Sequence, residues 1–401
     1  MSGDLVLGLG GSVDYEIVWS SSTMEALIAE YGIRASQLTT SVPVTSERSL
    51  VISLLAFMAD GAGGERYIAS SDIVRRFASR FEMRVALGGT CVRAAIAMSK
   101  LGIRSVLHLV SVNDYFRTLL PAECSYICSA DQDSLDPHLI VQFGQGARVH
   151  SGDIDLEAES PNRVMYANDR PKQEMVLSDQ LGPALRHAEI FLISGFNAVR
   201  DRTILDLRLV SLVSQMRGLP TDALVFYEDA AFHEPSLSGR VREMLRGFID
   251  VYSLNEDEMQ SYLGRRVDLL DVDDMEDALR SLSALIPVPT LVVHTKYWAL
   301  AWGESAQDYA DALRGGVTMA STRYCYGDAI TREAYEEVGR FPANLRGQEF
   351  SHGVQERLGK GSVCCVPALA LDPTAPTAVV GLGDSFVGGF IAAMTRRDLA
   401  V

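Results

Sequence analysis

The turn Gly381-Leu382-Gly383-Asp384, near the C-terminal end of the chain, combines residues that can do chemistry. Its two glycines free the backbone between an apolar stretch and a helical pattern, so successive N–H groups can point at one anion, helped by the helix dipole. A carboxylate at the end of such a turn can accept the proton of a hydroxyl group. Phosphoryl transfer needs both features, so the turn predicts a phosphoryl-transfer site with Asp384 as the general base.

Two other glycine-rich segments could also approach a ligand. The sequence GLGGSVD, which ends at Asp14, has Val13 where the dinucleotide-binding pattern needs its third glycine, and the chain contains no P-loop sequence. The segment therefore either delivers Asp14 to the carboxyl edge of a sheet or forms an ordinary turn with a capping aspartate. The pair Gly88-Gly89 precedes an alanine-rich helical pattern, where it either admits a ligand to backbone N–H groups or packs a helix N-terminus closely.

Acidic residues in the middle of the chain could hold a cation. Asn255 and Glu258 form an N-x-x-E sequence at a predicted strand-to-helix junction, where an amide and a carboxylate suit hydrated Mg²⁺. The same residues could instead be a helix N-cap with an acidic first turn. Glu228 stands at another predicted strand end, and His294-Thr295 at a third.

Apolar runs alternate with helical patterns along most of the chain, which predicts an α/β fold with a doubly wound, mostly parallel sheet covered by helices on both faces. The predicted strands are Leu5–Leu9, Ser105–Val110, Glu189–Ile193, Ala223–Tyr227, Val251–Leu254, Thr290–His294 and Val363–Pro367. The predicted helices are Cys91–Lys100, Thr203–Met216, Leu237–Phe248, Glu256–Tyr262, Met275–Ala284 and Asp384–Met394.

Two stretches, residues 15–84 and 136–178, break this rhythm with shorter strands and mixed helices. The alternation in HLIVQFGQGARVH suits an exposed antiparallel sheet. We therefore expect a smaller α/β lid domain, inserted into a large nucleotide-binding and catalytic domain made of residues 1–14, 85–135 and 179–401.

Composition limits the partners. The chain has 401 residues, of which 47% are hydrophobic, and a formal net charge of −16. This charge repels nucleic acid and anionic membranes, and no segment reads as a secretory signal or a membrane span, so we expect a cytoplasmic monomer or small homo-oligomer. Six cysteines without a C-x-x-C pair predict free, buried thiols, although the spacing of Cys124 and Cys128 could place two thiols on one helical face. The acidic run from Asp271 to Asp277 predicts a solvated helix start.

Taken together, the Gly-Gly helix, Glu228, the N-x-x-E sequence and the G-x-G-D turn resemble the ADP-dependent glucokinase and phosphofructokinase family of the ribokinase-like superfamily. The hallmarks of that family are H-x-E, N-x-x-E and G-x-G-D in this order. The resemblance covers nearly the whole chain and includes GGERYIAS, DPHLIVQF, NDR, ISGFN and VVHTKY. Two departures stand out. Phe226 replaces the histidine of H-x-E, and Thr90, Cys91 and Arg93 replace the glutamine and small residues that usually open the Gly-Gly helix, which implies an acceptor site unlike that of a plain glucokinase.

The resemblance implies a magnesium-dependent transfer of the terminal phosphoryl group of ADP to a hydroxyl of a sugar, sugar phosphate or sugar-like acceptor. It places Asp384 as base and the amides of Gly381 to Asp384 around the transferred group. The further roles that it implies are acceptor binding by Asp14, Gly88, Gly89 and His138, nucleotide binding by Arg170, Asn255, His294, Thr295 and Leu382, and metal binding by Glu228 and Glu258, with Asn255 nearby. Arg93 departs from the family, and we assign it to the acceptor site because its charge suits an anionic group.

Two alternatives remain open from the sequence. The sequence DSFVGGF after the predicted base is closer to ATP-dependent ribokinase-like sugar or nucleoside kinases. The altered H-x-E sequence favours a catalytically silent protein that binds a sugar or nucleotide, whereas the intact Asp384, Asn255 and Glu258 favour an active kinase.

Overall fold

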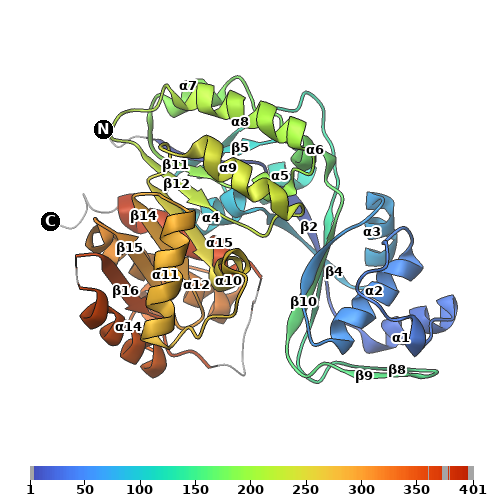
Figure 1. Ribbon diagram of the computed structural model, residues 1–401. Coiled ribbons are helices and arrows are strands. Elements are labelled where there is room, and N and C mark those ends of the chain that lie inside the picture. The colour runs from blue at the N-terminus through green and yellow to red at the C-terminus, as the bar shows by residue number, and fades with distance from the viewer. Residues whose placement is uncertain (1–3, 360, 373–377, 379, 396–401) are drawn as a thin grey trace.

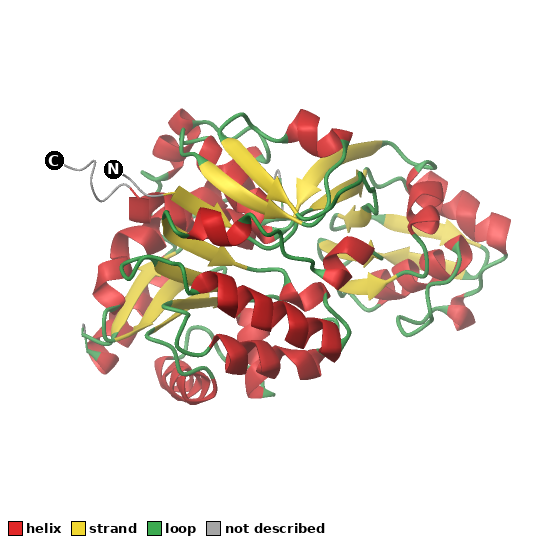
Figure 2. Ribbon diagram, turned by 90° about the horizontal axis from the view of Figure 1, so that it is seen from above, coloured by secondary structure: helices red, strands yellow, loops and turns green. Residues whose placement is uncertain are grey.

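The computed structural model describes residues 4–359, 361–372, 378 and 380–395. Within this part of the chain, a nine-stranded sheet and a five-stranded sheet lie side by side, and a two-stranded hairpin extends from the smaller one (Figure 1). Figure 2 shows the two sheets from above, each with its own helices. The structure thus has the α/β architecture, with a large and a small unit, that the sequence predicts.

The larger sheet has the strand order β16-β15-β14-β13-β12-β11-β1-β5-β6. Neighbouring strands from β6 to β14 run parallel, and β15 runs antiparallel to both β14 and β16. The strands are β1 (Asp4–Leu7), β5 (Ser105–Leu109), β6 (Cys124–Cys128), β11 (Ala188–Ile193), β12 (Leu224–Glu228), β13 (Val251–Asn255), β14 (Thr290–His294), β15 (Trp298–Gly303) and β16 (Val363–Pro367). All seven predicted strands are therefore confirmed as members of this sheet.

Strand β6 corrects the helical interpretation of Cys124 and Cys128. The segment CSYIC pairs in parallel with β5, which leaves the two cysteines in an edge strand instead of on a helix. Cys91, Cys124, Cys128, Cys364 and Cys365 are free thiols, as expected, and of these Cys128 is only partly buried.

Side chains of the larger sheet alternate between two hydrophobic cores. In β11, Ile190 and Leu192 face one core, whereas Phe191 and Ile193 face the other. This alternation is the mark of a sheet that is covered on both faces.

Helices fill both cores. The helices of the first core that cover the larger sheet are α4 (Thr90–Ser99), α5 (Asp114–Leu119), α12 (Ala310–Tyr326), α13 (Arg332–Val338) and α15 (Leu382–Thr395), and this core continues into the helices of the smaller unit. Those in the second are α7 (Leu181–Leu185), α8 (Arg202–Met216), α9 (Ser238–Leu245), α10 (Glu256–Leu263), α11 (Val272–Leu285) and α14 (Leu345–Leu358). Short connecting elements are α6 (Arg170–Glu174), η1 (Ala35–Gln37), η2 (Phe196–Ala198), η3 (Pro235–Leu237) and η4 (Ala306–Tyr309). Every helix in the described part of the chain is too short or too polar to span a bilayer.

The six predicted helices are present as α4, α8, α9, α10, α11 and α15. Asp271 caps α11 by accepting a hydrogen bond from the Asp274 amide at 2.8 Å, so the acidic run does start a helix. Helices α12 and α14 and strand β15 were not predicted.

Helix α15 is fixed between α4 and α12 by backbone contact. A Cβ atom on Gly388 would lie 2.7 Å from the Ala94 carbonyl oxygen, and one on Gly315 would lie 2.5 Å from the Gly389 carbonyl oxygen. Only glycine permits such close approach. The N-terminal turn of α15, which carries Asp384, is therefore held by three tightly packed helices.

The smaller sheet has the order β3-β10-β7-β2-β4 and mixed strand directions. Its strands are β2 (Ser12–Ile17), β3 (Gly64–Tyr67), β4 (Met83–Gly88), β7 (His138–Phe143) and β10 (Asn162–Ala167), and the hairpin is β8 (Arg148–Ser151) and β9 (Ile154–Glu157). Helices α1 (Ser21–Tyr31), α2 (Glu47–Ala59) and α3 (Ser71–Ala78) lie on the side of this sheet that faces away from the larger one (Figure 1).

Strand β2 explains why the smaller sheet takes part in the site. Val13, Tyr15 and Ile17 pack in the hydrophobic core. Ser12, Asp14 and Glu16 alternate with them and must point to the opposite face, toward the larger sheet. Both expectations for Asp14, at the carboxyl edge of a sheet or as the cap of an ordinary turn, are therefore wrong: β1 ends at Leu7, and Asp14 lies inside β2. The predicted boundaries at residues 14 and 85 fall within β2 and β4.

Candidate active site

The turn between β16 and α15 has the form that its glycines predict. Gly381 has a φ angle of +73°, and its carbonyl oxygen accepts hydrogen bonds from the Ser385 amide at 3.0 Å and from the Ser385 hydroxyl at 2.8 Å. Asp384 lies in the first turn of α15, with its side chain 25% exposed. The first amides of a helix lack partners inside the helix and carry partial positive charge, so this turn can bind an anion beside a carboxylate.

Arginine side chains from two helices close over the turn. A Cβ atom on Gly381 would lie 2.9 Å from Nη1 of Arg93 and 3.3 Å from Nε of Arg323. Arg323, on α12, donates from Nε to the Val380 carbonyl oxygen at 2.7 Å and so fixes the backbone that leads into the turn. Glycine at position 381 is needed both for its positive φ angle and for these two contacts.

Arg93, on α4, joins the turn to the smaller sheet. Its Nη2 donates to Asp14 Oδ2 at 2.8 Å and to Glu16 Oε1 at 3.3 Å, and its Nε lies 3.8 Å from Asp384 Oδ2. Glu16 also pairs with Arg84. Two carboxylates of β2 and the predicted base thus surround one buried guanidinium.

Asp14 occupies the space beside the double glycine. A Cβ atom on Gly88 would overlap the Asp14 carboxylate, and Gly89 has a φ angle of +89° at the start of α4. Burial alone would raise the pKa of Asp14, but Arg93 and His138 outweigh burial and lower the pKa below its ordinary value. The double glycine therefore makes room for an ionised carboxylate.

His138 lies next to Asp14 on the adjacent strand β7. Its Nδ1 is 3.9 Å from Asp14 Oδ1, and its Nε2 is 3.3 Å from Asp169 Oδ2 without hydrogen-bond geometry to any described residue. A buried ring nitrogen without a partner is costly, so this nitrogen is available to a ligand.

A second group of acidic side chains lies at the ends of β12, β13 and β14. Nε2 of His294 is 3.0 Å from Glu228 Oε1, while Glu228 Oε2 is buried and has no partner among the described residues. Burial, together with Asp229 and Glu228, raises the pKa of Glu258 to about 8. Burial alone would lower the pKa of His294, but Glu228 outweighs burial and raises it.

His294 also contacts the Gly-Leu-Gly-Asp turn. A Cβ atom on Gly383 would lie 3.4 Å from His294 Cε1, and the imidazole stacks on Phe386 of α15 with ring centroids 4.6 Å apart. The acidic group and the predicted base are thus linked through one side chain.

Phe226, which replaces the family's histidine, is fully buried and packs against Phe390 at 5.2 Å. The partner of Glu228 comes instead from β14, two strands away in the sheet. The role that the altered H-x-E sequence left unassigned therefore has a candidate in His294.

Asn255 and Glu258 form the capping box that their spacing allows. The Asn255 side chain accepts hydrogen bonds from the amides of Asp257 and Glu258, and Glu258 Oε2 accepts from the Asn255 amide at 2.8 Å. Both interpretations of N-x-x-E remain compatible, because the capped Glu258 still has its second oxygen and Asn255 still has its amide nitrogen.

Two predicted residues make other contacts. Arg170 is 82% exposed and pairs with Glu174 of its own short helix at 2.7 Å. The Thr295 hydroxyl donates to the Trp298 carbonyl oxygen at 3.0 Å and accepts from the amides of Tyr297 and Trp298, so it builds the turn between β14 and β15.

Sequence reasoning missed several site residues. Asp229 follows Glu228 directly and accepts hydrogen bonds from the hydroxyls of Tyr252 at 2.7 Å and Tyr262 at 2.6 Å, and burial raises its pKa. Glu16 was also missed, although its position two residues after Asp14 would place both on one face of a strand.

Basic side chains gather on the same side as Asp14. Lys172 packs beside Gly10, where a Cβ atom would lie 3.8 Å from Lys172 Cγ, and its charge acts on Cys91 together with that of Asp384. Burial lowers the pKa of His233, and Lys172 adds to this effect. Within the described part of the chain, Lys172 forms no salt bridge, so its charge is open to a ligand.

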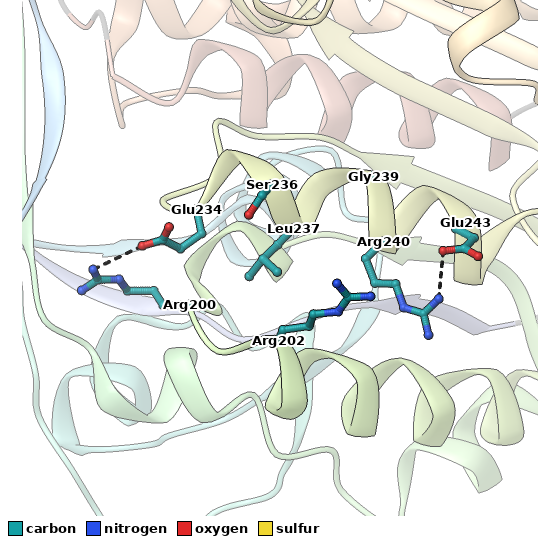
Figure 3. A pocket seen from close by; sticks show the side chains of 8 residues that line it. All are labelled: Arg200, Arg202, Glu234, Ser236, Leu237, Gly239, Arg240 and Glu243. Atoms are coloured by element: carbon teal, nitrogen blue, oxygen red, sulfur yellow. Dashed lines mark hydrogen bonds and ion pairs between the residues drawn. The ribbon is translucent and has the colours of Figure 1, made fainter.

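A cavity of about 400 Å³ between η3, α8 and α9 lies apart from these groups (Figure 3). Its lining contains none of the predicted site residues. The arginines that line it are already paired: Arg200 with Glu234, Arg202 with Asp206, and Arg240 with Asp206 and Glu243. The cavity therefore adds nothing to the candidate site.

Comparisons with known proteins identify the family and the fold. Residues 4–391 match the family described as the ADP-specific phosphofructokinase/glucokinase conserved region. No curated protein matches the sequence. A hypothetical ADP-dependent phosphofructokinase from Pyrococcus horikoshii OT3 superimposes with a TM-score of 0.77 at 17% identity, over 98% of each chain.

Other solved structures share the fold. An ADP-dependent kinase in complex with fructose-6-phosphate and ADPβS is similar with a TM-score of 0.74 at 13% identity, over 98% of this chain and 94% of the other. An adenosine kinase from Anopheles gambiae is similar with a TM-score of 0.53 at 14% identity, over 99% and 90% of the two chains. The likeness in fold therefore extends to an adenosine kinase.

Proposed function

Because the chain belongs to the ADP-specific phosphofructokinase/glucokinase family, a family of ADP-dependent sugar kinases, we propose that it transfers the terminal phosphoryl group of ADP to a hydroxyl of a sugar-like acceptor and releases AMP. One observation carries the proposal: Asp384 stands beside the free amides of α15, between the buried carboxylates of β2 and those of β12 and α10. A base, an anion site and two further charged groups meet there.

Asp384 would accept the proton of the acceptor hydroxyl as its oxygen attacks phosphorus. The amides of Gly381 to Asp384 would donate to the phosphoryl oxygens, whose charge grows during transfer. The bond from phosphorus to the oxygen of AMP breaks as the bond to the acceptor forms. The close packing of α15 against α4 and α12 keeps these donors in place without reorganisation.

The acidic group fits a divalent cation. Glu228 has a buried oxygen without a partner, and Glu258 has its pKa raised to about 8 by burial and neighbouring carboxylates, so both would gain from added positive charge. Glu228 and Glu258 would hold Mg²⁺, mainly through water, and the amide nitrogen of Asn255 would donate to such a water. When bound, the ion would offset the charge of the nucleotide phosphates. His294, Thr295 and Leu382 would border the nucleotide.

For the acceptor, we propose a phosphorylated sugar. Asp14 and His138 would bind its hydroxyls next to Gly88 and Gly89. Lys172, which has no salt bridge among the described residues, would bind its phosphate with help from nearby His233. The likeness to a kinase solved with fructose-6-phosphate makes that compound the first one to test.

Formation of AMP, measured with ADP or ATP as donor, tests the transfer. The acceptors to compare are fructose 6-phosphate, glucose, fructose and adenosine. Asp384→Asn should lower kcat by about 10²–10⁴, because it removes the base and keeps the size. Asp311→Asn, an exposed aspartate on α12, is the matched control. Nearly unaltered turnover in Asp384→Asn would show that Asp384 is not the base. Turnover with ATP but not with ADP would contradict ADP as the donor.

Lys172→Ala tests the acceptor separately. Its KM for fructose 6-phosphate should rise by about tenfold, as expected for one lost charged contact, with little change for glucose. Arg170→Ala, two residues earlier, is the control for a general loss of charge. A higher KM for ADP in Arg170→Ala would support the nucleotide role that the sequence predicts for Arg170.

A further inference from the structure

The guanidinium of Arg93 has an unusual position for a residue that only balances charge. It is 7% exposed, and it lies between carboxylates from two elements, β2 and α15. Asp14 and Glu16, both on β2, hold Nη2, and Asp384 on α15 lies 3.8 Å from Nε. Two of its three nitrogens therefore face carboxylates.

The third nitrogen faces the turn. Within the described residues, Nη1 of Arg93 has no hydrogen-bond partner, although it would be 2.9 Å from a Cβ atom on Gly381. Arg323 approaches the same point, but its Nε is used by the Val380 carbonyl oxygen. Nη1 is therefore the open donor beside the anion site of α15.

We propose that Arg93 is a catalytic residue whose Nη1 donates a hydrogen bond to an oxygen of the phosphoryl group while this group passes from ADP to the acceptor. This inference rests on the proposed function. Arg93 stays protonated throughout, and the proton of the acceptor hydroxyl goes to Asp384. The two carboxylates of β2 hold the guanidinium plane, so the donor is fixed before the reaction begins.

The chemistry of arginine suits this role. A guanidinium keeps its charge at any working pH, and its donors form a rigid, planar fork. In a buried site, a fixed positive group stabilises charge that develops on phosphoryl oxygens far better than it would in water. The carboxylates do not cancel this effect: Glu16 is also paired with Arg84, and Asp384 loses its charge when it takes the acceptor proton, which leaves Asp14 as the main counter-charge of Arg93.

A structural role is the rival explanation, in which Arg93 only neutralises Asp14 and Glu16. The two roles predict different results for Arg93→Lys, because lysine keeps the charge and can still pair with the carboxylates but lacks Nη1. A structural role predicts nearly full activity for this variant. A catalytic role predicts a loss of kcat of about 10²-fold or more with KM values that change little.

The test compares Arg93→Lys and Arg93→Ala with Arg84→Ala, which removes the other arginine of the same network but does not reach the turn. AMP formation from ADP and fructose 6-phosphate in the wild type tests the proposed function by itself. The ratio of kcat in each variant to kcat in the wild type tests the role of Arg93. Guanidinium chloride at millimolar concentration should restore part of the turnover of Arg93→Ala and none of that of Arg84→Ala.

Binding of AMP with aluminium fluoride, a mimic of the transferring phosphoryl group, gives a second measurement that needs no acceptor. Titration calorimetry should show tight binding to the wild type and to Arg84→Ala, and binding at least tenfold weaker to Arg93→Lys, with AMP alone bound equally by all three. Equal binding of the mimic by Arg93→Lys, or full kcat in that variant, would overturn the role. Absence of mimic binding by the wild type would overturn it as well.

Discussion

Two groups of buried carboxylates flank Asp384, and the protein treats them in opposite ways. Asp14 and Glu16 on β2 are matched by Arg93 and Arg84, and the pKa of Asp14 is lowered. Within the described part of the chain, Glu228 on the other side pairs with His294, and Glu258 forms no salt bridge.

The pKa of Glu258 is raised to about 8. Burying charge without a partner is costly, so a protein keeps such a group where an outside charge will join it. The comparison teaches that arginines of the chain itself neutralise the β2 carboxylates, whereas the β12 and α10 carboxylates are the ones for which we propose a bound cation.

Removing the counter-ion of the β2 carboxylates should have the largest effect on stability. Arg93→Ala leaves the buried Asp14 without its counter-ion and should reduce the free energy of unfolding by about 3–5 kcal/mol, measured by urea denaturation. Arg84→Ala should reduce the free energy of unfolding by less than about 1 kcal/mol, because the Arg84 side chain is half exposed. Equal costs for the two variants would mean that the two carboxylates do not depend on one buried partner.

Changing the carboxylates of β12 and α10 should alter the dependence on Mg²⁺. Glu228→Gln should weaken the apparent affinity for Mg²⁺ by about 10- to 100-fold, measured by titrating turnover or the melting temperature. Glu16→Gln makes the same chemical change on the other side and should leave the Mg²⁺ titration unaltered. A shift in Glu16→Gln as large as that in Glu228→Gln would remove the distinction between the two groups.

The two sides should also depend on pH in opposite directions. Glu258 binds its proton more tightly in the folded protein, so the stability that its protonated form contributes is present below its ordinary pKa near 4.5 and is lost as pH rises to about 8. The slope is at most about 1.4 kcal/mol per pH unit for one group. Unfolding in EDTA, with Glu258→Gln as the comparison, should show this slope in the wild type and a flatter curve in the variant.

Asp14 should make the stability of the protein depend on pH in the acid range instead. Its lowered pKa contributes stability above its ordinary value near 3.8, and this stability is lost as pH falls through the folded pKa. Asp14→Asn should therefore be less stable than the wild type at neutral pH, and the difference should shrink in acid. A difference that stays constant down to pH 2 would contradict the ionised state of Asp14.

The smallest effect is expected from His294→Gln. Glutamine can still donate a hydrogen bond to Glu228, but it carries no charge, so the Mg²⁺ titration should shift by only a few-fold, toward tighter binding because a competing cation is gone. His352→Gln, an exposed histidine on α14, is the control. A loss of all Mg²⁺ response in His294→Gln would show that the histidine positions Glu228 and does not merely balance it.

Local patterns in the sequence were sufficient for much of the fold. The seven predicted strands and six predicted helices are present because each is set by periodicity and by capping residues a few positions apart. The N-x-x-E sequence gave a capping box, and the G-x-G-D sequence gave a turn at a helix N-terminus. The match to the ADP-specific family confirms the resemblance that the order of these sequences indicates.

The position of Asp14 could not be predicted in the same way. The segment after β1 passes within a few residues from the larger sheet to the smaller one, and the alternation of β2 does not say which sheet the strand will join. The segment from Cys124 to Cys128 was likewise too short for its period to separate a strand from a helix.

The sequence by itself determined the elements, the turn that carries Asp384 and the family. Tertiary structure alone decided that Arg93 meets Asp14 and Asp384, and that His294, from another strand, meets Glu228 in place of Phe226. The physical reason is that capping, turns and periodicity act over a few residues. The pairing of buried charges instead depends on strand order and on which helix faces pack together, which are properties of the whole chain.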